Sequence, residues 1–326
     1  MKKTILMIII FAFIPLNVYA VNNQEYINTH FMEIKEYYPD YDIFIGNKIL
    51  KDNSLEDEAE KLKKIYGSID LYSCFYSKDE LSNNIFVYKD IIETKTVEYK
   101  IINAVAYIRI LTFAEGTYEK VLKASHIMDE NEIRHLILDL RNNKGGEIAE
   151  SIEIAKLFVK EGLIAKINYY SVELKDEEYY SNLKDLQYKV IVLINSETSS
   201  AAELLAGAIQ DSKSGVLIGQ QTFGKSRVQK LIPIMTEDAF LNINKDSKEP
   251  TVNLIKASGS GVIWENQYLS GWAKITVGKF YTKNGYDIEG NGITPDYIIN
   301  DKLSFLPVEA LLFLIIPFYC GSLFIS

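Results

Sequence analysis

The chain has 326 residues, 48% of them hydrophobic and 24% charged, and carries a formal net charge of −9 at pH 7. A chain this acidic is a poor candidate for binding nucleic acid or an anionic membrane surface. Its two cysteines, Cys74 and Cys320, exclude a disulfide framework and leave open one bridge between them. His30, His126 and His135 are not spaced as metal ligands, and we interpret them as surface or strand-end residues. We therefore expect neither a metal nor a cofactor.

Residues 1–20 have the pattern of an export signal. Two lysines precede an apolar run, and Val18 and Ala20 place small side chains where signal peptidase requires them. An uncleaved anchor is the alternative, but the run contains Pro15 and is shorter than the roughly 20 residues that a span needs. Cleavage near Ala20 would leave 306 residues with a formal charge of −11, outside the cytoplasm.

Residues 21–100 are polar, charged and rich in tyrosine. Apolar residues recur at helical spacing over 55–69, which predicts one helix there. We interpret the segment as a small N-terminal cap or lid module of helical or mixed structure.

Residues 101–301 alternate between buried strands and amphipathic helices, which predicts an α/β domain. Helices are expected at 116–132, 147–162 and 200–211, and strands at 104–111, 135–140, 189–195, 215–219, 226–235 and 273–282.

Two further segments interrupt or follow this domain. An insertion at 236–270 lies between two core strands, and we interpret it as a surface excursion that could also shape a substrate groove. The tail at 302–326 is mainly apolar after Ala310. We favour a helix packed on the core over a membrane anchor, because Pro317 and Gly321 break the run.

The stretch GQQTFGKS, residues 219–226, fits the pattern of a phosphate-binding loop. Such a loop works by leading directly into a helix, whose free N–H groups bind the phosphates. The residues after Lys225 are instead rich in β-branched side chains and include Pro233, which predicts a strand. We therefore expect no nucleotide at this loop.

Ser200 stands where the apolar strand at 189–195 gives way to a helix. The first N–H groups of a helix have no internal partner and carry the positive end of its dipole, so they can stabilise an oxyanion. The alternative is that Ser200 only caps the helix. Paired glycines, Gly145 and Gly146, follow the strand at 135–140 and could bring another N–H group to the same site.

Taken in order, these segments resemble the C-terminal processing, or tail-specific, serine peptidases. The likeness runs from VAYIRILTF through LILDLRNNKGG, VLINSETSSAAELLAGAIQD, LIGQQTFGKSRVQ and KITVGKFYTKNGYDIEGNGITPD, and covers about 190 residues. It implies a spiral of ββα units of the kind shared by the Clp protease and crotonase group. It also implies polypeptide substrates.

The resemblance assigns each part of a catalytic site. It implies that Ser200 is the nucleophile, Lys225 the general base and Gln229 the residue that orients the base. The oxyanion donors would be the backbone N–H of Ala201 and that of Gly145 or Gly146.

A lysine can accept the serine proton only when it is neutral, so burial must lower its pKa. Phe223 and Val228 are expected to supply the apolar surroundings of Lys225, and no carboxylate lies within four residues of it in the sequence. Residues four apart on a regular strand are about 13 Å apart, so a contact between Gln229 and Lys225 requires a bend near Ser226.

The chain departs from the family in one important respect. Members commonly carry a peptide-binding PDZ module before the catalytic core, and the 80 residues available here show no loop of that kind. The sequence thus predicts an exported serine endopeptidase, with cleavage near substrate C-termini left open. The alternative is an inactive peptide-binding or scaffold protein of the same fold.

Overall fold

The computed structural model describes residues 58–77, 95–102, 104–172, 174–235, 256–258, 261–263 and 269–299, together with Ile34. The expected export signal, the C-terminal tail at 302–326 and most of the insertion at 236–270 lie outside the described residues. No helix within the described ranges is long and apolar enough to cross a membrane.

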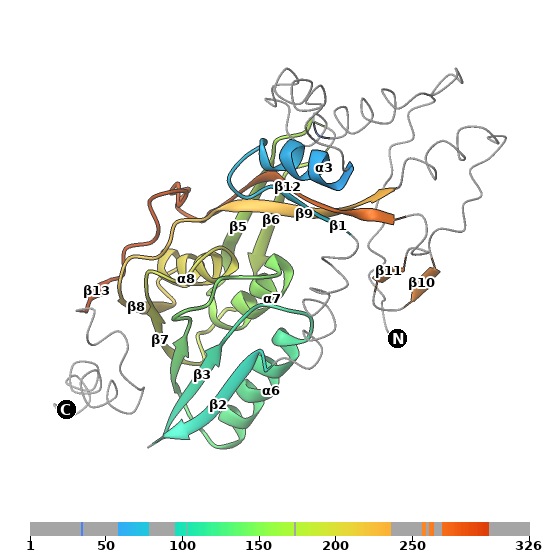
Figure 1. Ribbon diagram of the computed structural model, residues 1–326. Coiled ribbons are helices and arrows are strands. Elements are labelled where there is room, and N and C mark those ends of the chain that lie inside the picture. The colour runs from blue at the N-terminus through green and yellow to red at the C-terminus, as the bar shows by residue number, and fades with distance from the viewer. Residues whose placement is uncertain are drawn as a thin grey trace.

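A six-stranded sheet forms the main body of the molecule (Figure 1). Neighbouring strands are parallel except at one edge, where β2 runs antiparallel to β3. The strands, in their spatial order, are β13 (Tyr297–Ile298), β8 (Gly215–Gly219), β7 (Lys189–Ile194), β4 (His135–Asp139), β3 (Val105–Ile110) and β2 (Val97–Ile102).

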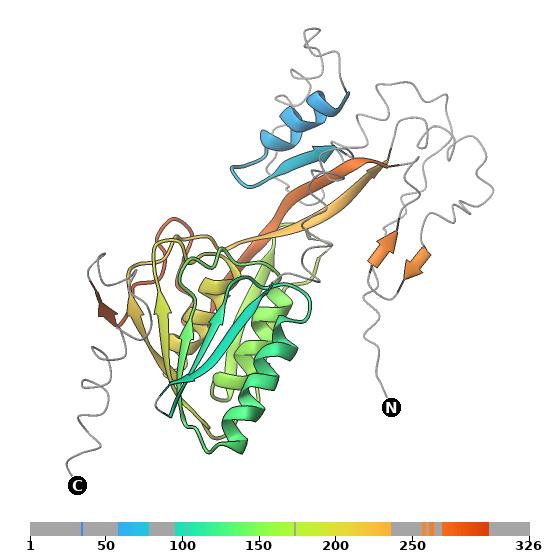
Figure 2. The same cartoon turned by 60° about the horizontal axis from the view of Figure 1, so that its bottom comes forward.

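Three helices cover one face of this sheet: α6 (Thr117–Glu130), α7 (Ile148–Phe158) and α8 (Ala201–Asp211) (Figure 2). Helix α6 buries one stripe at helical spacing, whereas nearly every residue of α8 is buried. Helix α8 lies between β8 and the second sheet. Its small residues permit this, because a Cβ on Gly207 would lie 2.8 Å from Thr282 Cγ2.

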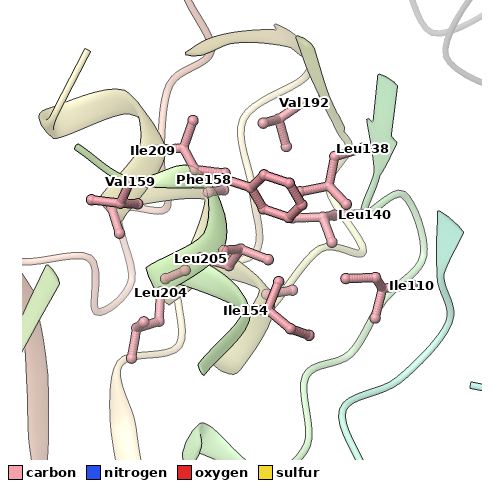
Figure 3. Close-up of a cluster of buried hydrophobic side chains, with 14 of the residues drawn as sticks. Ile110, Leu138, Leu140, Ile154, Phe158, Val159, Val192, Leu204, Leu205 and Ile209 are labelled. Atoms are coloured by element: carbon pink, nitrogen blue, oxygen red, sulfur yellow. The ribbon is translucent and has the colours of Figure 1, made fainter. Parts of the chain in front are cut away.

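The main hydrophobic cluster lies between these helices and the sheet (Figure 3). Phe158 and Ile154 of α7 meet Leu138 of β4 and Leu205 of α8 there. Because this cluster fixes the ends of β4, β7 and α8, it also fixes the loops that carry the predicted site.

A second sheet has the order β1–β12–β5–β6, and β9 pairs with the other edge of β12. Strands β9 and β12 form a long ribbon that projects from the body (Figure 2). The bounds are β1 (Cys74–Ser77), β5 (Gly162–Tyr169), β6 (Glu177–Ser181), β9 (Arg227–Met235) and β12 (Leu269–Thr282).

Helix α3 (Glu58–Gly67) packs on one face of this ribbon and forms a second hydrophobic cluster. The cluster joins Ile65 and Phe75 from the N-terminal segment to Ala273 and Ile275 of β12. A short hairpin, β10 (Lys256–Ser258) and β11 (Gly261–Ile263), lies within the insertion.

The α/β class predicted from the sequence is confirmed, as are its predicted helices and strands to within a few residues at each end. The sequence did not predict strands β1, β2, β5, β6, β10, β11 and β13. Strand β2 also crosses the boundary expected at residue 100 and joins the sheet of the main domain. The N-terminal segment is therefore built into both sheets.

Candidate active site

Ser200 is the residue immediately before α8, at the junction that the sequence predicts. Its backbone has φ 58° and ψ −122°, a conformation that residues with a Cβ rarely adopt. Strain of this kind costs on the order of 1–3 kcal/mol and is concentrated at functional sites. Within the described part of the chain, no acceptor bonds the N–H of Ala201, the first of the helix. That N–H is therefore available to a ligand beside Ser200.

The loop that carries Ser200 is fastened to the turn after β4. The Ser199 N–H donates to the Asn143 carbonyl oxygen at 2.9 Å, and the Thr198 hydroxyl donates to the Leu140 carbonyl oxygen at 2.9 Å. These bonds place the two loops predicted to form the oxyanion site side by side.

Gly145 lies directly against the predicted nucleophile. A Cβ on Gly145 would lie 2.8 Å from the Ser200 Cβ and 3.0 Å from the Ala201 nitrogen, and the φ of Gly145 is +94°. The N–H of Gly145 donates to Asn143 Oδ1 at 2.8 Å. The glycine thus allows the turn to approach the serine, while its own N–H is engaged within the turn.

Gly146 has a different environment. It forms an isolated β-bridge with Phe113, and a Cβ at Gly146 would lie 2.0 Å from the Phe113 carbonyl oxygen. The sequence left Gly145 and Gly146 as equal candidates for the second oxyanion donor. Of the two, Gly145 is packed against the serine, and Gly146 fastens the turn to the segment after β3.

The predicted base and its predicted orienting residue are in contact. Lys225 Nζ donates to Gln229 Oε1 at 2.9 Å. Strand β9 begins only at Arg227, and the Ser226 N–H turns away to Glu289 Oε2 at 3.0 Å. The bend expected near Ser226 is therefore present. A strand follows Lys225, so the helix that a phosphate loop needs does not follow it.

The surroundings of Lys225 differ from the expectation in one respect. Phe223 is 55% exposed, so its ring does not bury the lysine. Lys225 Nζ instead lies 4.9 Å from the ring centroid of Tyr72, and Gln229 Nε2 donates to the Tyr72 carbonyl oxygen at 2.6 Å. Tyr72 lies just before β1, about 150 residues earlier in the sequence, where local reasoning could not find it. Val228 is buried in the main hydrophobic cluster.

Glu203 connects the serine loop to the lysine loop. This fully buried carboxylate accepts the Ser200 N–H and the Lys225 N–H on the same oxygen, each at 2.8 Å. Its other oxygen accepts the Gly224 N–H at 2.7 Å and the Thr222 hydroxyl at 2.5 Å. The distance between the backbone nitrogens of Ser200 and Lys225 is therefore at most the sum of these two 2.8 Å hydrogen bonds.

This role of Glu203 was not predicted from the sequence. The signal was a carboxylate within the stretch AAELLAGAI, whose other residues are small or apolar, since such a group needs partners when it is buried. Burial raises the pKa of Glu203, and its four hydrogen bonds oppose that rise.

The pKa of Lys225 is lowered, first by burial and then by the positive charge of Lys274. Glu289 and Asp70 act in the opposite direction. The sequence shows no carboxylate close to Lys225, but the fold brings these two from distant segments. Burial and Lys274 outweigh them, which favours the neutral lysine that base catalysis requires.

The two described histidines take no part in this arrangement. His135 opens β4 and pairs with Lys189 at the start of β7, whereas Ser200 follows the opposite end of β7. Burial and Lys189 lower the pKa of His135. His126 lies within α6.

Comparison with known proteins gives a consistent result. A family model described as peptidase family S41 matches residues 104–299. A carboxyl-terminal-processing protease of Synechocystis is 31% identical over 203 residues, which are 61% of this chain and 39% of that protein. A carboxy-terminal-processing protease of Bartonella bacilliformis is 28% identical over 226 residues, 68% of this chain and 44% of that protein.

The chain spans less than half the length of these two curated relatives. One solved structure, of a lipoprotein from Streptococcus agalactiae, covers 92% of this chain and 98% of its own, with a TM-score of 0.60 and 16% identity. That likeness shows a shared fold.

Proposed function

This chain belongs to peptidase family S41, and we propose on that basis that it is a serine endopeptidase in which Ser200 and Lys225 form the catalytic pair. The observation that carries the proposal is the Glu203 carboxylate, which binds the backbone of both residues through one oxygen. The contact between Lys225 and Gln229 supports the role of Gln229 in orienting the base.

In the proposed mechanism, neutral Lys225 removes the proton from the Ser200 hydroxyl while the Ser200 oxygen attacks the carbonyl carbon of a peptide bond. A tetrahedral oxyanion forms. The protonated lysine then gives that proton to the leaving amine, and the C–N bond breaks. Water completes the cycle by hydrolysing the acyl-enzyme, with the same lysine as its base.

We propose the Ala201 N–H as the first oxyanion donor, because it has no acceptor among the described residues and adjoins the serine. The second is the N–H of Gly145, the residue that packs against Ser200 and Ala201. Since that N–H donates to Asn143 Oδ1, the substrate oxygen must replace this acceptor.

The test is cleavage of an unstructured protein such as casein by the purified chain from residue 21 onward. Wild type is expected to cut it, and Ser200→Ala and Lys225→Ala are expected to reduce the rate by at least about 10³-fold. Binding of casein without any cleavage by wild type would instead favour the inactive scaffold.

Mass spectrometry of the fragments addresses the substrate. We propose polypeptide substrates in general, with no requirement for a particular C-terminus. Accumulation of fragments that have lost only short C-terminal segments would contradict this and show tail-specific cleavage. Fragments still formed by Ser200→Ala would reveal a contaminating protease.

We also propose that the protein is exported and cleaved after Ala20, on the pattern of residues 1–20. N-terminal sequencing of the protein from the producing cells should begin at Val21. Carbonate washing of the membranes would release a secreted form of the protein, whereas a form held by the C-terminal tail would stay in the membrane. An intact Met1 in the mature protein would contradict cleavage after Ala20 and favour an uncleaved anchor.

A further inference from the structure

Residues 70–73 lie between α3 and β1, against the segment that holds the proposed base. We call residues 70–73 the Asp70 turn. Tyr72 contacts the base segment, residues 225–229, in two places. The Tyr72 ring lies 4.9 Å from Lys225 Nζ, and the Tyr72 carbonyl oxygen accepts Gln229 Nε2 at 2.6 Å.

The second contact decides which way the Gln229 amide faces. An amide side chain has a donor end and an acceptor end, and either end could face a neutral lysine. A backbone carbonyl can only accept, so the Tyr72 oxygen requires the NH₂ end of Gln229. The acceptor end, Oε1, must then face Lys225 Nζ, where it lies at 2.9 Å.

That orientation matters for a neutral lysine. The amine has two N–H bonds and one lone pair, and the amide oxygen engages one of the N–H bonds. This restricts rotation about the terminal C–N bond, so the lone pair can be held toward the Ser200 hydroxyl. An amide facing the other way would bind the lone pair itself and remove the base.

The Asp70 turn is itself firmly anchored. Asp70 Oδ1 accepts the N–H groups of Tyr72 at 2.9 Å and Ser73 at 2.7 Å, which shapes the turn. Asp70 Oδ2 pairs with Arg227 Nη1 at 3.5 Å, midway between Lys225 and Gln229 in sequence.

The far end of the turn is tied to β12. Ser73 Oγ accepts the Thr276 N–H at 3.1 Å, and Thr276 is the cross-strand partner of Gln229. The Asp70 turn is thus held by Arg227, two residues before Gln229, and by Thr276, which lies opposite Gln229 on β12.

We propose that the Asp70 turn is the positioning element of the catalytic base, with Asp70 and the Tyr72 carbonyl fixing the Gln229 amide against Lys225. The N-terminal segment is then a working part of the active site. This inference rests on the proposed Ser200 and Lys225 mechanism.

Two substitutions at one position test it. Asp70→Asn and Asp70→Ala both remove the negative charge beside Arg227, but the asparagine oxygen can still accept the two N–H bonds of the turn. The difference between the two variants therefore isolates the turn from the charge. Asp211→Ala is the matched control, since Asp211 Oδ2 also anchors a turn, accepting the Asn284 N–H at 2.9 Å, at the other end of β12.

Asp70→Ala is expected to lower kcat by roughly 10- to 100-fold while changing KM little, because the base is misplaced and the substrate site is kept. Asp70→Asn should restore most of kcat, and Asp211→Ala should keep it. The rising limb of the pH profile should lie at higher pH for Asp70→Ala than for Asp70→Asn, since water then reaches Lys225. Equal kcat and equal pH profiles for the two Asp70 variants would overturn the proposal.

A second measurement does not depend on activity. NMR titration of Lys225 Nζ in lysine-labelled protein, assigned with Lys225→Arg, should show a higher pKa in Asp70→Ala than in Asp70→Asn. Wild type without Ser200-dependent cleavage would refute the proposed function. The same titration in both Asp70 variants would refute the positioning role, whether or not the protein cleaves anything.

Discussion

At the scale of single residues, Lys225 combines a lowered pKa with a nearby positive charge. Burial disfavours its charged form most, and Lys274 adds to this across the ribbon. Lys274 Nζ itself lies 3.4 Å from the Tyr76 hydroxyl and 5.7 Å from the centre of that ring. Lys274 therefore acts on Lys225 from β12, and a change at Lys274 should alter the titration of Lys225.

The pH dependence of activity follows from this pair. Activity should rise with pH as Lys225 loses its proton, with the rising limb below the ordinary lysine pKa because the folded-state pKa is lowered. Lys274→Met removes the repelling charge, so the pKa of Lys225 should rise and the limb should move to higher pH. The pH profile of kcat/KM measures this in the free enzyme. Lys156→Met, at a surface ion pair on α7, should leave the profile in place.

Glu203 gives a second prediction at this scale. Glu203→Gln keeps the shape but turns an NH₂ group toward donors that need an acceptor, so buried N–H groups lose their partners. The free energy of unfolding should fall by about 2–4 kcal/mol, and kcat by roughly 10- to 100-fold, because Ser200 and Lys225 are no longer held to one carboxylate. Urea denaturation and steady-state kinetics measure the two effects.

The control for this substitution is Glu153→Gln on the exposed side of α7, where an ion pair with Lys156 is solvated. Its effect on unfolding should stay within about 0.5 kcal/mol. Wild-type stability in Glu203→Gln would mean that the carboxylate does not hold the two loops together.

At the level of single residues, the sequence predicts positions that depend on neighbouring residues, but it does not predict contacts between distant segments. The positions of Ser200 before a helix and of Lys225 before a strand follow from adjacent residues, and both are confirmed. The contacts of Tyr72 and Asp70 with the base segment depend on strand pairing across about 200 residues, which no local pattern encodes. Phe223 was expected to bury Lys225 because it is apolar, but the loop turns its ring to solvent.

At the scale of elements, the glycine turn after β4 depends on close approach. Gly146 and Gly162 share the same φ of +136°, but a Cβ would lie 2.0 Å from the Phe113 carbonyl oxygen at Gly146 and would meet nothing within 4 Å at Gly162. The pair therefore separates the cost of backbone strain from the cost of a steric clash.

Gly162→Ala should lower the free energy of unfolding by on the order of 1–3 kcal/mol, the cost of the backbone conformation alone. Gly146→Ala should cost about 1–3 kcal/mol more, because Phe113 must also move. Denaturant unfolding of both variants measures the difference. Equal losses would show that the turn can shift away from Phe113 without penalty.

The elements predicted from the sequence are those with a strong pattern of their own. Strands β4 and β7 are continuous apolar runs, and α6 carries a regular buried stripe. Strand β1 has only four residues and becomes a strand through its pairing with β12, as in Cys74 opposite Lys274. The hairpin of β5 and β6 was missed because charged and tyrosine residues obscure its alternation.

At the scale of the whole molecule, two hydrophobic clusters hold the two halves of the proposed site. The main cluster fixes β7 and α8 and thereby Ser200. The second cluster joins α3 and β1 to the ribbon of β9 and β12, and thereby holds the Asp70 turn against Lys225. The site thus lies where two separately stabilised parts of the chain meet, and local opening of the second part would displace the base and leave the nucleophile in place.

This division predicts different patterns of hydrogen exchange for two comparable core substitutions. Ile65→Ala, in the second cluster, and Ile154→Ala, in the main cluster, each remove the same atoms from a buried site and should each cost about 2–5 kcal/mol locally. Ile65→Ala should speed amide exchange in α3, β1 and the first half of β12, while β4 and β7 stay protected. Ile154→Ala should speed exchange in β4, β7 and α8. Mass spectrometry of exchange in the full chain measures both, and loss of protection throughout the molecule in Ile65→Ala would show that the two clusters unfold as one unit.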